Sequence, residues 1–119
     1  ADLSETTLVE ADLSGAMLWR SQLGHANLTN ANLSRANLHE AQLRHATIVN
    51  ANLDGANLID ADLSAAILTA ATLRRSQLIQ AKLRRVVLQG ANLERADCAS
   101  ADFSDGDLSR AELVGANLE

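Results

Sequence analysis

Apolar, small and polar residues follow one another along this chain in a pattern that repeats every five residues. Counted in fives from Leu3, the central residue of each pentad is Leu as far as Leu118, except at Ile48, Cys98 and Phe103. We number the pentad positions 1 to 5, with the central residue at position 3. Position 1 is Ala almost throughout, and its replacements are Thr6, Ser21, Ser76, Val86 and Gly106.

This period excludes both regular secondary structures. A helix turns by about 100° per residue, so central residues five apart would be spread around it without forming an apolar stripe. A straight strand would place Leu28 and Leu33 on opposite sides, because successive side chains alternate between its faces. The pattern is satisfied if the chain turns after each pentad, so that every central residue faces one shared axis. The sequence therefore predicts a solenoid of stacked coils.

The centres Ala51-Asn52-Leu53 and Ala61-Asp62-Leu63 resemble those of the pentapeptide-repeat family, and the resemblance covers the entire chain. It implies an all-β fold, a right-handed quadrilateral β-helix in which four pentads make one square coil of about twenty residues. The 119 residues would then form about six coils, and the unbroken register predicts a single domain, 1–119.

Four pentads per coil divide the surface into four faces. The first face begins with residues 1–5, the second with 6–10, the third with 11–15 and the fourth with 16–20, and each continues in steps of twenty. Asn and Asp recur at position 2, as in the columns Asn32, Asn52 and Asn92 on the third face and Asn37, Asn57, Asp97 and Asn117 on the fourth. Such side chains bond either to one another or to nearby backbone. We interpret them as structural, because they recur on every side.

Two faces carry apolar stripes. The second offers Val9, Val49, Ile67 and Val87, and position 4 of the fourth lines up Trp19, His39, Ile59, Ile79 and Ala99. β-Branched residues suit a flat β surface, whereas contiguous exposed apolar area commonly marks an interface. Both interpretations stay open, and the possible protein-docking stripe is Trp19, His39, Ile59 and Ile79, with Trp19 as its anchor.

Charge is zoned along the chain, whose net charge is −5. Residues 1–12 and 94–119 are mainly acidic, and residues 74–85 are basic. Arg74 and Arg75 would lie on the third face, opposite Lys82, Arg84 and Arg85 on the first, so the basic zone is predicted to be a girdle. The girdle and the acid excess argue against direct nucleic-acid binding. No apolar run is long enough to span a bilayer, so a soluble chain without a membrane partner is expected.

The sequence offers no convergent set of catalytic groups and no Gly-rich phosphate cradle, so neither an enzyme nor a bound cofactor is expected. His25 and His45 would stack in one column, but their neighbours Ala65 and Arg85 make a poor metal site, and none is predicted. Cys98 occupies a leucine position and is interpreted as a buried hydrophobe. A single cysteine suits a reducing compartment such as the cytoplasm. Because the chain starts at Ala1, a removed leader stays open.

The favoured function is a non-enzymatic structural or interaction module that presents flat faces to an unidentified protein partner. The resemblance implies an alternative, since some pentapeptide-repeat proteins are acidic rods that mimic duplex DNA and bind DNA gyrase, protecting it from quinolone drugs. The possible acidic mimic surface comprises Asp97, Asp102, Asp105, Asp107 and Glu112. Mixed charge favours docking over mimicry. Both end coils expose apolar centres and acidic residues, which predicts a monomer or a weak end-to-end homodimer that strengthens in salt.

Overall fold

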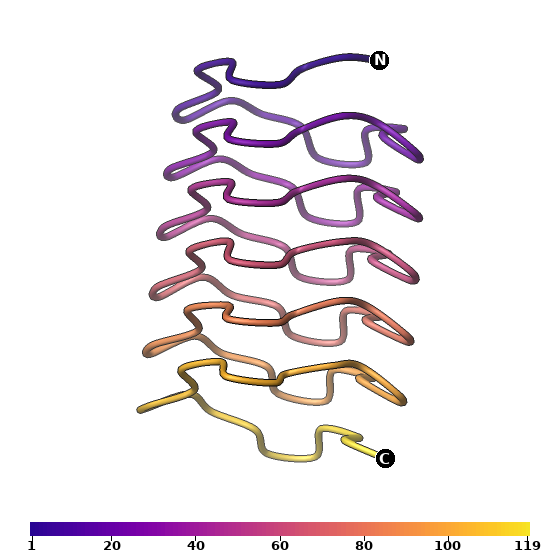
Figure 1. The fold of residues 1–119 in the computed structure, drawn as a ribbon, viewed down its shortest axis with the longest axis vertical. Coiled ribbons are helices and arrows are strands. Elements are labelled where there is room, and N and C mark those ends of the chain that lie inside the picture. Colours follow the sequence, from indigo (N-terminus) through magenta and orange to yellow (C-terminus); the bar gives the residue numbers. More distant parts are fainter.

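The computed structural model describes residues 1–119 as coils stacked around one axis (Figure 1). Residues twenty apart lie beside one another, because parallel bridges join position 2 of each coil to position 2 of the next, from Asp2–Gln22 to Asp97–Asn117. The stack measures 32 Å along its longest axis and 23 by 21 Å across it. The structure therefore has the twenty-residue coil that the family resemblance implies.

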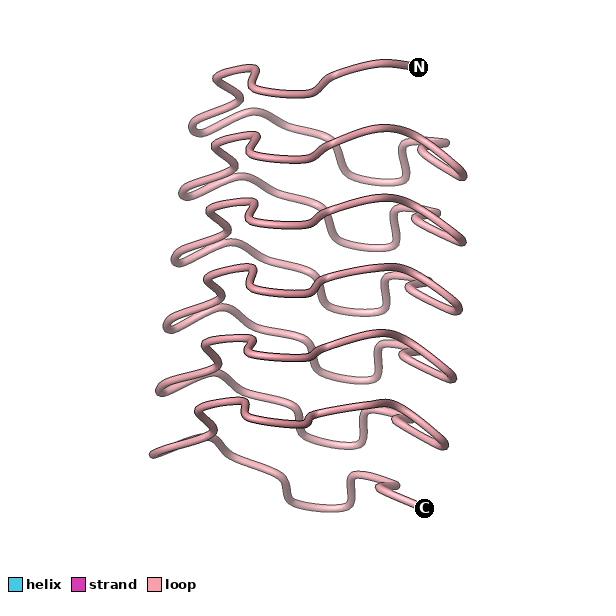
Figure 2. Ribbon diagram, viewed as in Figure 1, coloured by secondary structure: helices cyan, strands magenta, loops and turns pink.

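The expected strands are reduced to single-residue bridges. The structure contains no helix and no regular strand, and every residue lies in a bridge, a turn or a short connection (Figure 2). The reason is that positions 4 and 5 turn the chain immediately after each bridge, so pairing cannot extend along it. It follows that no helix of the structure is long and apolar enough to cross a membrane.

Each pentad ends in a tight turn that makes a corner of the coil. The amide of position 1 donates to the carbonyl three residues earlier, as from Ala31 to Leu28 at 3.0 Å. Position 5 has a positive φ at every turn from Glu5 to Gly115, with 56° at Arg75. A positive φ at the third residue of a turn is the feature of type II. Most of these residues are not glycine, so a conformation that L-residues rarely adopt recurs at every corner.

Backbone hydrogen bonds join the coils in a repeating set. The amide of position 3 donates to the carbonyl of position 2 in the next coil, as from Leu33 to Asn52 at 2.6 Å. The amide of position 5 donates to the carbonyl of position 4 there, as from Arg35 to Asp54 at 2.9 Å. In return, the amide of position 2 donates to the previous coil, as from Asn52 to Ala31 at 2.9 Å. Only the amide of position 4 has no backbone acceptor.

Asn and Asp at position 2 supply the missing acceptor. At each Asn or Asp in this position, Oδ1 accepts the amide of position 4 in the same pentad, at 2.9 to 3.2 Å. Direct bonds between stacked side chains are few, such as Asn117 Nδ2 to Asp97 Oδ1 at 3.1 Å. Of the two expected uses of these side chains, the bond to nearby backbone is therefore the dominant one. It explains why short amide and carboxylate side chains recur on every face.

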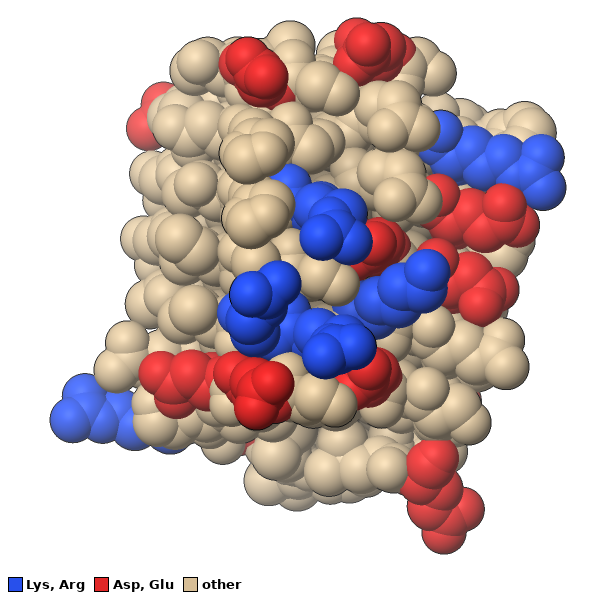
Figure 3. All heavy atoms as spheres, in the orientation of Figure 1, with Lys and Arg blue, Asp and Glu red and all other residues tan.

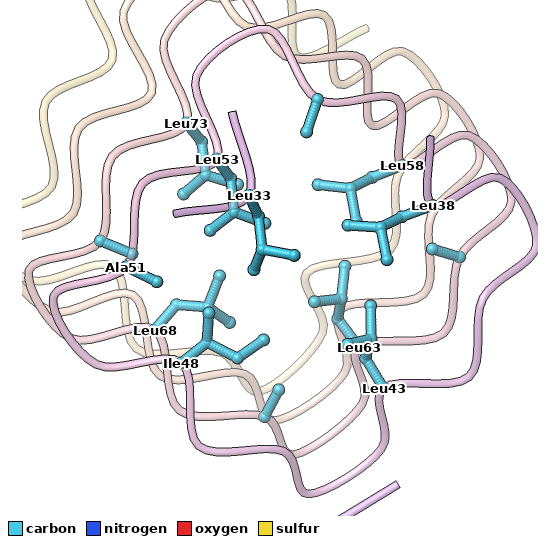
Figure 4. Packing of buried hydrophobic residues seen from close by; sticks show 14 of the residues in the cluster. Leu33, Leu38, Leu43, Ile48, Ala51, Leu53, Leu58, Leu63, Leu68 and Leu73 are labelled. Atoms are coloured by element: carbon cyan, nitrogen blue, oxygen red, sulfur yellow. The ribbon is translucent and has the colours of Figure 1, made fainter. Parts of the chain in front are cut away.

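Central residues and position-1 alanines fill the interior (Figure 4). Leu33, Leu38, Leu43 and Ile48 make one layer, and each has an exposed fraction of 0%. The buried apolar residues form one continuous cluster. Where Ser21 replaces Ala, its hydroxyl donates to the Leu18 carbonyl at 2.6 Å, and no buried side-chain polar atom lacks a partner. The axis is therefore a filled core.

Two departures from the alanine rule compensate for each other. Val86 and Gly106 both occupy position 1 of the second face, one coil apart. A Cβ added at Gly106 would lie 3.2 Å from Val86 Cγ1 and 3.0 Å from the Phe103 carbonyl oxygen. A side chain at Gly106 would therefore fit only if Val86 and the turn at Phe103 shifted by a few tenths of an ångström.

The positive φ of position 5 predicts different effects of the same substitution at neighbouring turn positions. Gln80 and Gln89 are both exposed, but Gln80 is at position 5 with φ 57°, whereas Gln89 is at position 4. We expect Gln80→Val to lower the free energy of unfolding by about 1 to 2 kcal/mol, because a β-branched residue is strained at positive φ. Gln89→Val serves as the matched control and should change it by less than about 0.5 kcal/mol. Equal urea midpoints for the two variants would contradict the turn assignment.

Candidate functional site

The hollows of the surface are polar and lie on the third face. Two adjoining hollows, of about 400 and 550 Å³, share Arg35 and Asp54. They lie at Gly15 and Gly55, two position-5 residues that have no side chain to fill the corner. No hydrophobic residue lines either hollow. Small-molecule sites are usually lined mostly by apolar and aromatic side chains. The exposed faces are therefore the better candidates for a functional site.

The predicted docking stripe forms a single column on the fourth face. Backbone bonds link the turns that carry its members, from Arg20 to the His39 carbonyl at 2.8 Å and from Glu40 to the Ile59 carbonyl at 2.9 Å. The expected exposure is only partly correct. Trp19 is 51% exposed, whereas His39, Ile59 and Ile79 are half-buried. Neighbours above and below cover these three, while Trp19 belongs to the first coil and has a stacked neighbour on one side only.

Met17 completes an apolar edge that sequence reasoning missed. It stands in the same pentad as Trp19 and is 73% exposed. Its exposure could have been inferred from its place at position 2, because the neighbouring pentads carry the polar residues Asp12 and Gln22 there. Together, Met17 and Trp19 make the exposed surface of this pentad largely apolar.

A polar chain holds the surroundings of Trp19 in place. The guanidinium carbon of Arg20 lies 5.2 Å from the centroid of the Trp19 ring, and Arg20 Nε donates to Glu40 Oε2 at 2.7 Å. The other carboxylate oxygen of Glu40 lies 3.0 Å from His39 Nε2, and His39 Nδ1 lies 3.1 Å from the Ile59 carbonyl oxygen. The bond from Arg20 is the main cause that lowers the pKa of Glu40.

The structure does not gather the predicted acidic residues on one face. Bridges place Asp97 beside Gln77 on the fourth face and Asp102 beside Lys82 on the first. Asp107 lies on the second face, Glu112 on the third and Asp105 at the corner after Asp102. The five acidic side chains therefore encircle the end of the stack rather than forming a continuous acidic strip.

The basic girdle is uneven. On the third face, Arg74 Nη2 lies 2.6 Å from Asp54 Oδ2, which offsets its charge. On the first face, Lys82, Arg84 and Arg85 make no ion pair. Figure 3 shows Lys and Arg side chains gathered in the middle of one face, with acidic side chains beyond them towards both ends of the stack.

The remaining candidate groups show no chemistry beyond packing. The His25 and His45 rings stack with centroids 4.9 Å apart and planes at 9°, and no three potential ligands come together to hold a metal ion. Cys98 is buried, and burial, assisted by the charge of Asp97, raises the pKa of its thiol to about 11. The structure therefore agrees with its interpretation as a small buried hydrophobe.

Asp62 is the most buried carboxylate and lies next to Lys82 in the same column of the first face. Its Oδ1 accepts the Ser64 amide at 3.0 Å, and its Oδ2 accepts Arg44 Nη1 at 3.3 Å. Burial is the largest single influence and would raise the pKa of Asp62, but the bonds from Ser64 and the charge of Arg44 together outweigh it, so that the pKa is lowered. Sequence reasoning missed this pair, because Arg44 and Asp62 belong to different coils.

The Asp62 pair predicts a dependence of stability on pH. A carboxyl whose pKa is lower in the folded chain stabilises the fold above its unfolded pKa, about 4, and loses this contribution as pH falls through the folded value. Asp62→Asn keeps an oxygen for the Ser64 amide but loses the charge opposite Arg44. We expect the variant to be about 0.5 to 1 kcal/mol less stable at neutral pH, and the difference to shrink as pH falls below about 4 and through the folded pKa of Asp62. Urea unfolding across this range measures it, and a difference independent of pH would contradict the assignment.

Comparison with known proteins agrees with this geometry. A family model described as a pentapeptide repeat region matches residues 21–98, and another, described as pentapeptide repeats in eight copies, matches residues 1–35 and 81–119. A search of curated protein sequences found no match.

Solved structures also match. The plasmid-mediated fluoroquinolone resistance protein QnrB1 is 17% identical with a TM-score of 0.75, over 96% of this chain and 70% of that one. HetL, a pentapeptide repeat protein involved in heterocyst differentiation regulation in Nostoc sp. strain PCC 7120, is 30% identical with a TM-score of 0.43, over 97% and 75%. The Nostoc pentapeptide repeat protein alr5209 is 35% identical with a TM-score of 0.44, over 95% and 84%. With its register and twenty-residue coils, the chain belongs to the pentapeptide-repeat family.

Proposed function

We propose that this chain is a non-enzymatic interaction module that docks a protein partner on its fourth face. The observation that carries the proposal is the exposed pair Met17 and Trp19 at the edge of a flat face. Large aromatic side chains commonly anchor protein interfaces. The filled axis and the polar hollows leave the faces as the surfaces that vary from coil to coil.

The surroundings of Trp19 support this role. Arg20 lies against the ring, and its bond to Glu40 fixes its position. An anchor that is already ordered loses less side-chain entropy on binding than a free one. Below it, the half-buried Ile59 and Ile79 continue an uncharged strip along the column. The partner is therefore expected to offer an apolar pocket for Trp19 and a flat apolar surface beside it.

The DNA-mimicking alternative has less support. The likeness to QnrB1 concerns the fold, and mimicry of a duplex needs a continuous run of negative charge. Here the acidic residues lie on four different faces, at Asp97, Asp102, Asp107 and Glu112. On the first face, Lys and Arg side chains without an ion pair also lie between the acidic residues. We therefore rank a gyrase-binding role second.

We also infer the full architecture that the resemblance implies, a right-handed quadrilateral β-helix. Its support is the fourfold repeat of pentads within each twenty-residue coil. The near side of the stack in Figure 1 runs from right to left as the chain descends, which accords with a right-handed coil.

The docking proposal predicts that truncating the anchor abolishes capture of the partner. We expect Met17→Ala/Trp19→Ala to retain the bound protein at least about tenfold less than wild type in affinity capture from source lysate. The matched control is Thr7→Ala/Val9→Ala, which truncates the same pentad positions in the same coil on the opposite face. If both variants retain the bound protein as wild type does, or both lose it equally, docking through the fourth face is wrong.

A further inference from the structure

The first face carries opposite charges at two separated levels of the stack. Asp2 and Glu5 lie in its first coil, and Lys82 and Arg85 lie in its fifth. All four side chains are exposed, and none of them makes an ion pair within the chain. Asp2 and Lys82 occupy position 2, while Glu5 and Arg85 occupy position 5. The two charge groups thus lie in the same two columns, at equal distances above and below the third coil.

We propose that this face binds a second copy of the chain, with the two rods antiparallel. The twofold axis lies in the plane of the interface, at right angles to the rods and level with the third coil. Rotation about it keeps each column opposite the same column of the second copy. It also places the first coil of one copy opposite the fifth coil of the other. Asp2 then faces Lys82 of the second copy, and Glu5 faces its Arg85. An isologous contact repeats every pair, so the acids and bases at both ends of the interface are matched at once.

The shapes of the intervening side chains fit the same arrangement. Arg84 comes opposite the small Ser4, Gly24 opposite Ser64, and His25 opposite Ala65. Arg44 is the one bulky cation near the axis, and it reaches towards the fourth coil, where Nη1 meets Asp62 Oδ2 at 3.3 Å. Asp62 therefore partly offsets the charge of Arg44, which lowers its repulsion from Arg44 of the second copy.

Other occupants fit less well. End-to-end stacking of two copies would put Asp102 over Asp2 and Asp105 over Glu5, because these residues share columns, so like charges would meet. A polyanion such as nucleic acid would meet acids at both ends of the basic group, in a chain of net charge −5. An antiparallel copy is the partner that presents acid and base at the required levels.

The expected association is weak and sensitive to salt. Five coils at about 4.8 Å span about 24 Å, and with a stack 21 Å across its shortest axis the face offers on the order of 500 Å² per copy. Interfaces below the standard size are typically transient. Exposed charge pairs are also screened by salt. Dimers should therefore form towards millimolar protein at low ionic strength and dissociate as salt is added.

Charge reversal tests the register directly. We expect Lys82→Glu/Arg85→Glu to associate about tenfold or more weakly than wild type in sedimentation velocity, and Asp2→Lys/Glu5→Arg to do the same, because each variant opposes like charges. A one-to-one mixture of the two variants should form a heterodimer, since one copy then offers acids at both levels and the other offers bases. Far-ultraviolet circular dichroism and thermal unfolding check that each variant is folded.

A second mixture serves as the matched control. Lys82→Glu/Arg85→Glu mixed with Asp102→Lys/Asp105→Arg should not form a heterodimer, because Asp102 and Asp105 lie outside the five paired coils. The proposal is overturned if wild type stays monomeric at millimolar concentration and low salt, if the first mixture fails to associate, or if the control mixture associates equally well. Nucleic-acid binding that is lost in Lys82→Glu/Arg85→Glu, without wild-type dimers, would assign the face to a polyanion instead.

Discussion

The fold depends on one constraint, which is that the backbone donors of each pentad must find acceptors although the chain changes direction after five residues. Between the two end coils, only some amides of position 4 escape it. Amides at positions 2, 3 and 5 meet this requirement through the coils above and below, as Leu33 does with Asn52 at 2.6 Å. The corner amide at position 1 closes its own turn. Positive φ at position 5 costs about 1 to 2 kcal/mol for an L-residue other than glycine. This strain recurs at each corner and is offset only when neighbouring coils accept the freed amides, so an isolated coil should not be stable.

Much of this could be predicted from the sequence, because the period of five and the apolar centres leave few geometries. The burial of Cys98 follows from counting in fives, and the columns follow once the resemblance supplies four pentads per coil. The corners could have been inferred as well, since Val, Ile and Thr never occur at position 5 but are frequent at position 4, as at Val9 and Ile59. That absence reflects the exclusion of β-branched side chains from positive φ.

Other features depend on distances that a pattern does not contain. Strands were expected, but the corners follow so closely that only single bridges form. Ile59 and Ile79 were expected to be exposed, but stacked neighbours half-cover them. The pairing of Arg44 with Asp62 depends on side-chain reach between coils. The faces differ because the repeat constrains positions 1 and 3 far more than positions 2, 4 and 5. One core can therefore support an apolar edge on the fourth face and a self-complementary charge pattern on the first.

The central claim concerns the amide of position 4. It finds an acceptor in the chain where position 2 is Asn or Asp, and otherwise only at Arg74, whose amide donates to Asp54 Oδ1 in the previous coil at 2.9 Å. Ile59 and Ile79 provide a matched pair, because they are the same residue type in the same column and both are half-buried. Asn57 Oδ1 accepts the Ile59 amide at 3.1 Å, whereas Gln77 makes no bond to the Ile79 amide. Amide hydrogen exchange measured by NMR should show the Ile59 amide strongly protected and the Ile79 amide exchanging much faster. Equal protection of the two amides would contradict this account of how the coils satisfy their backbone.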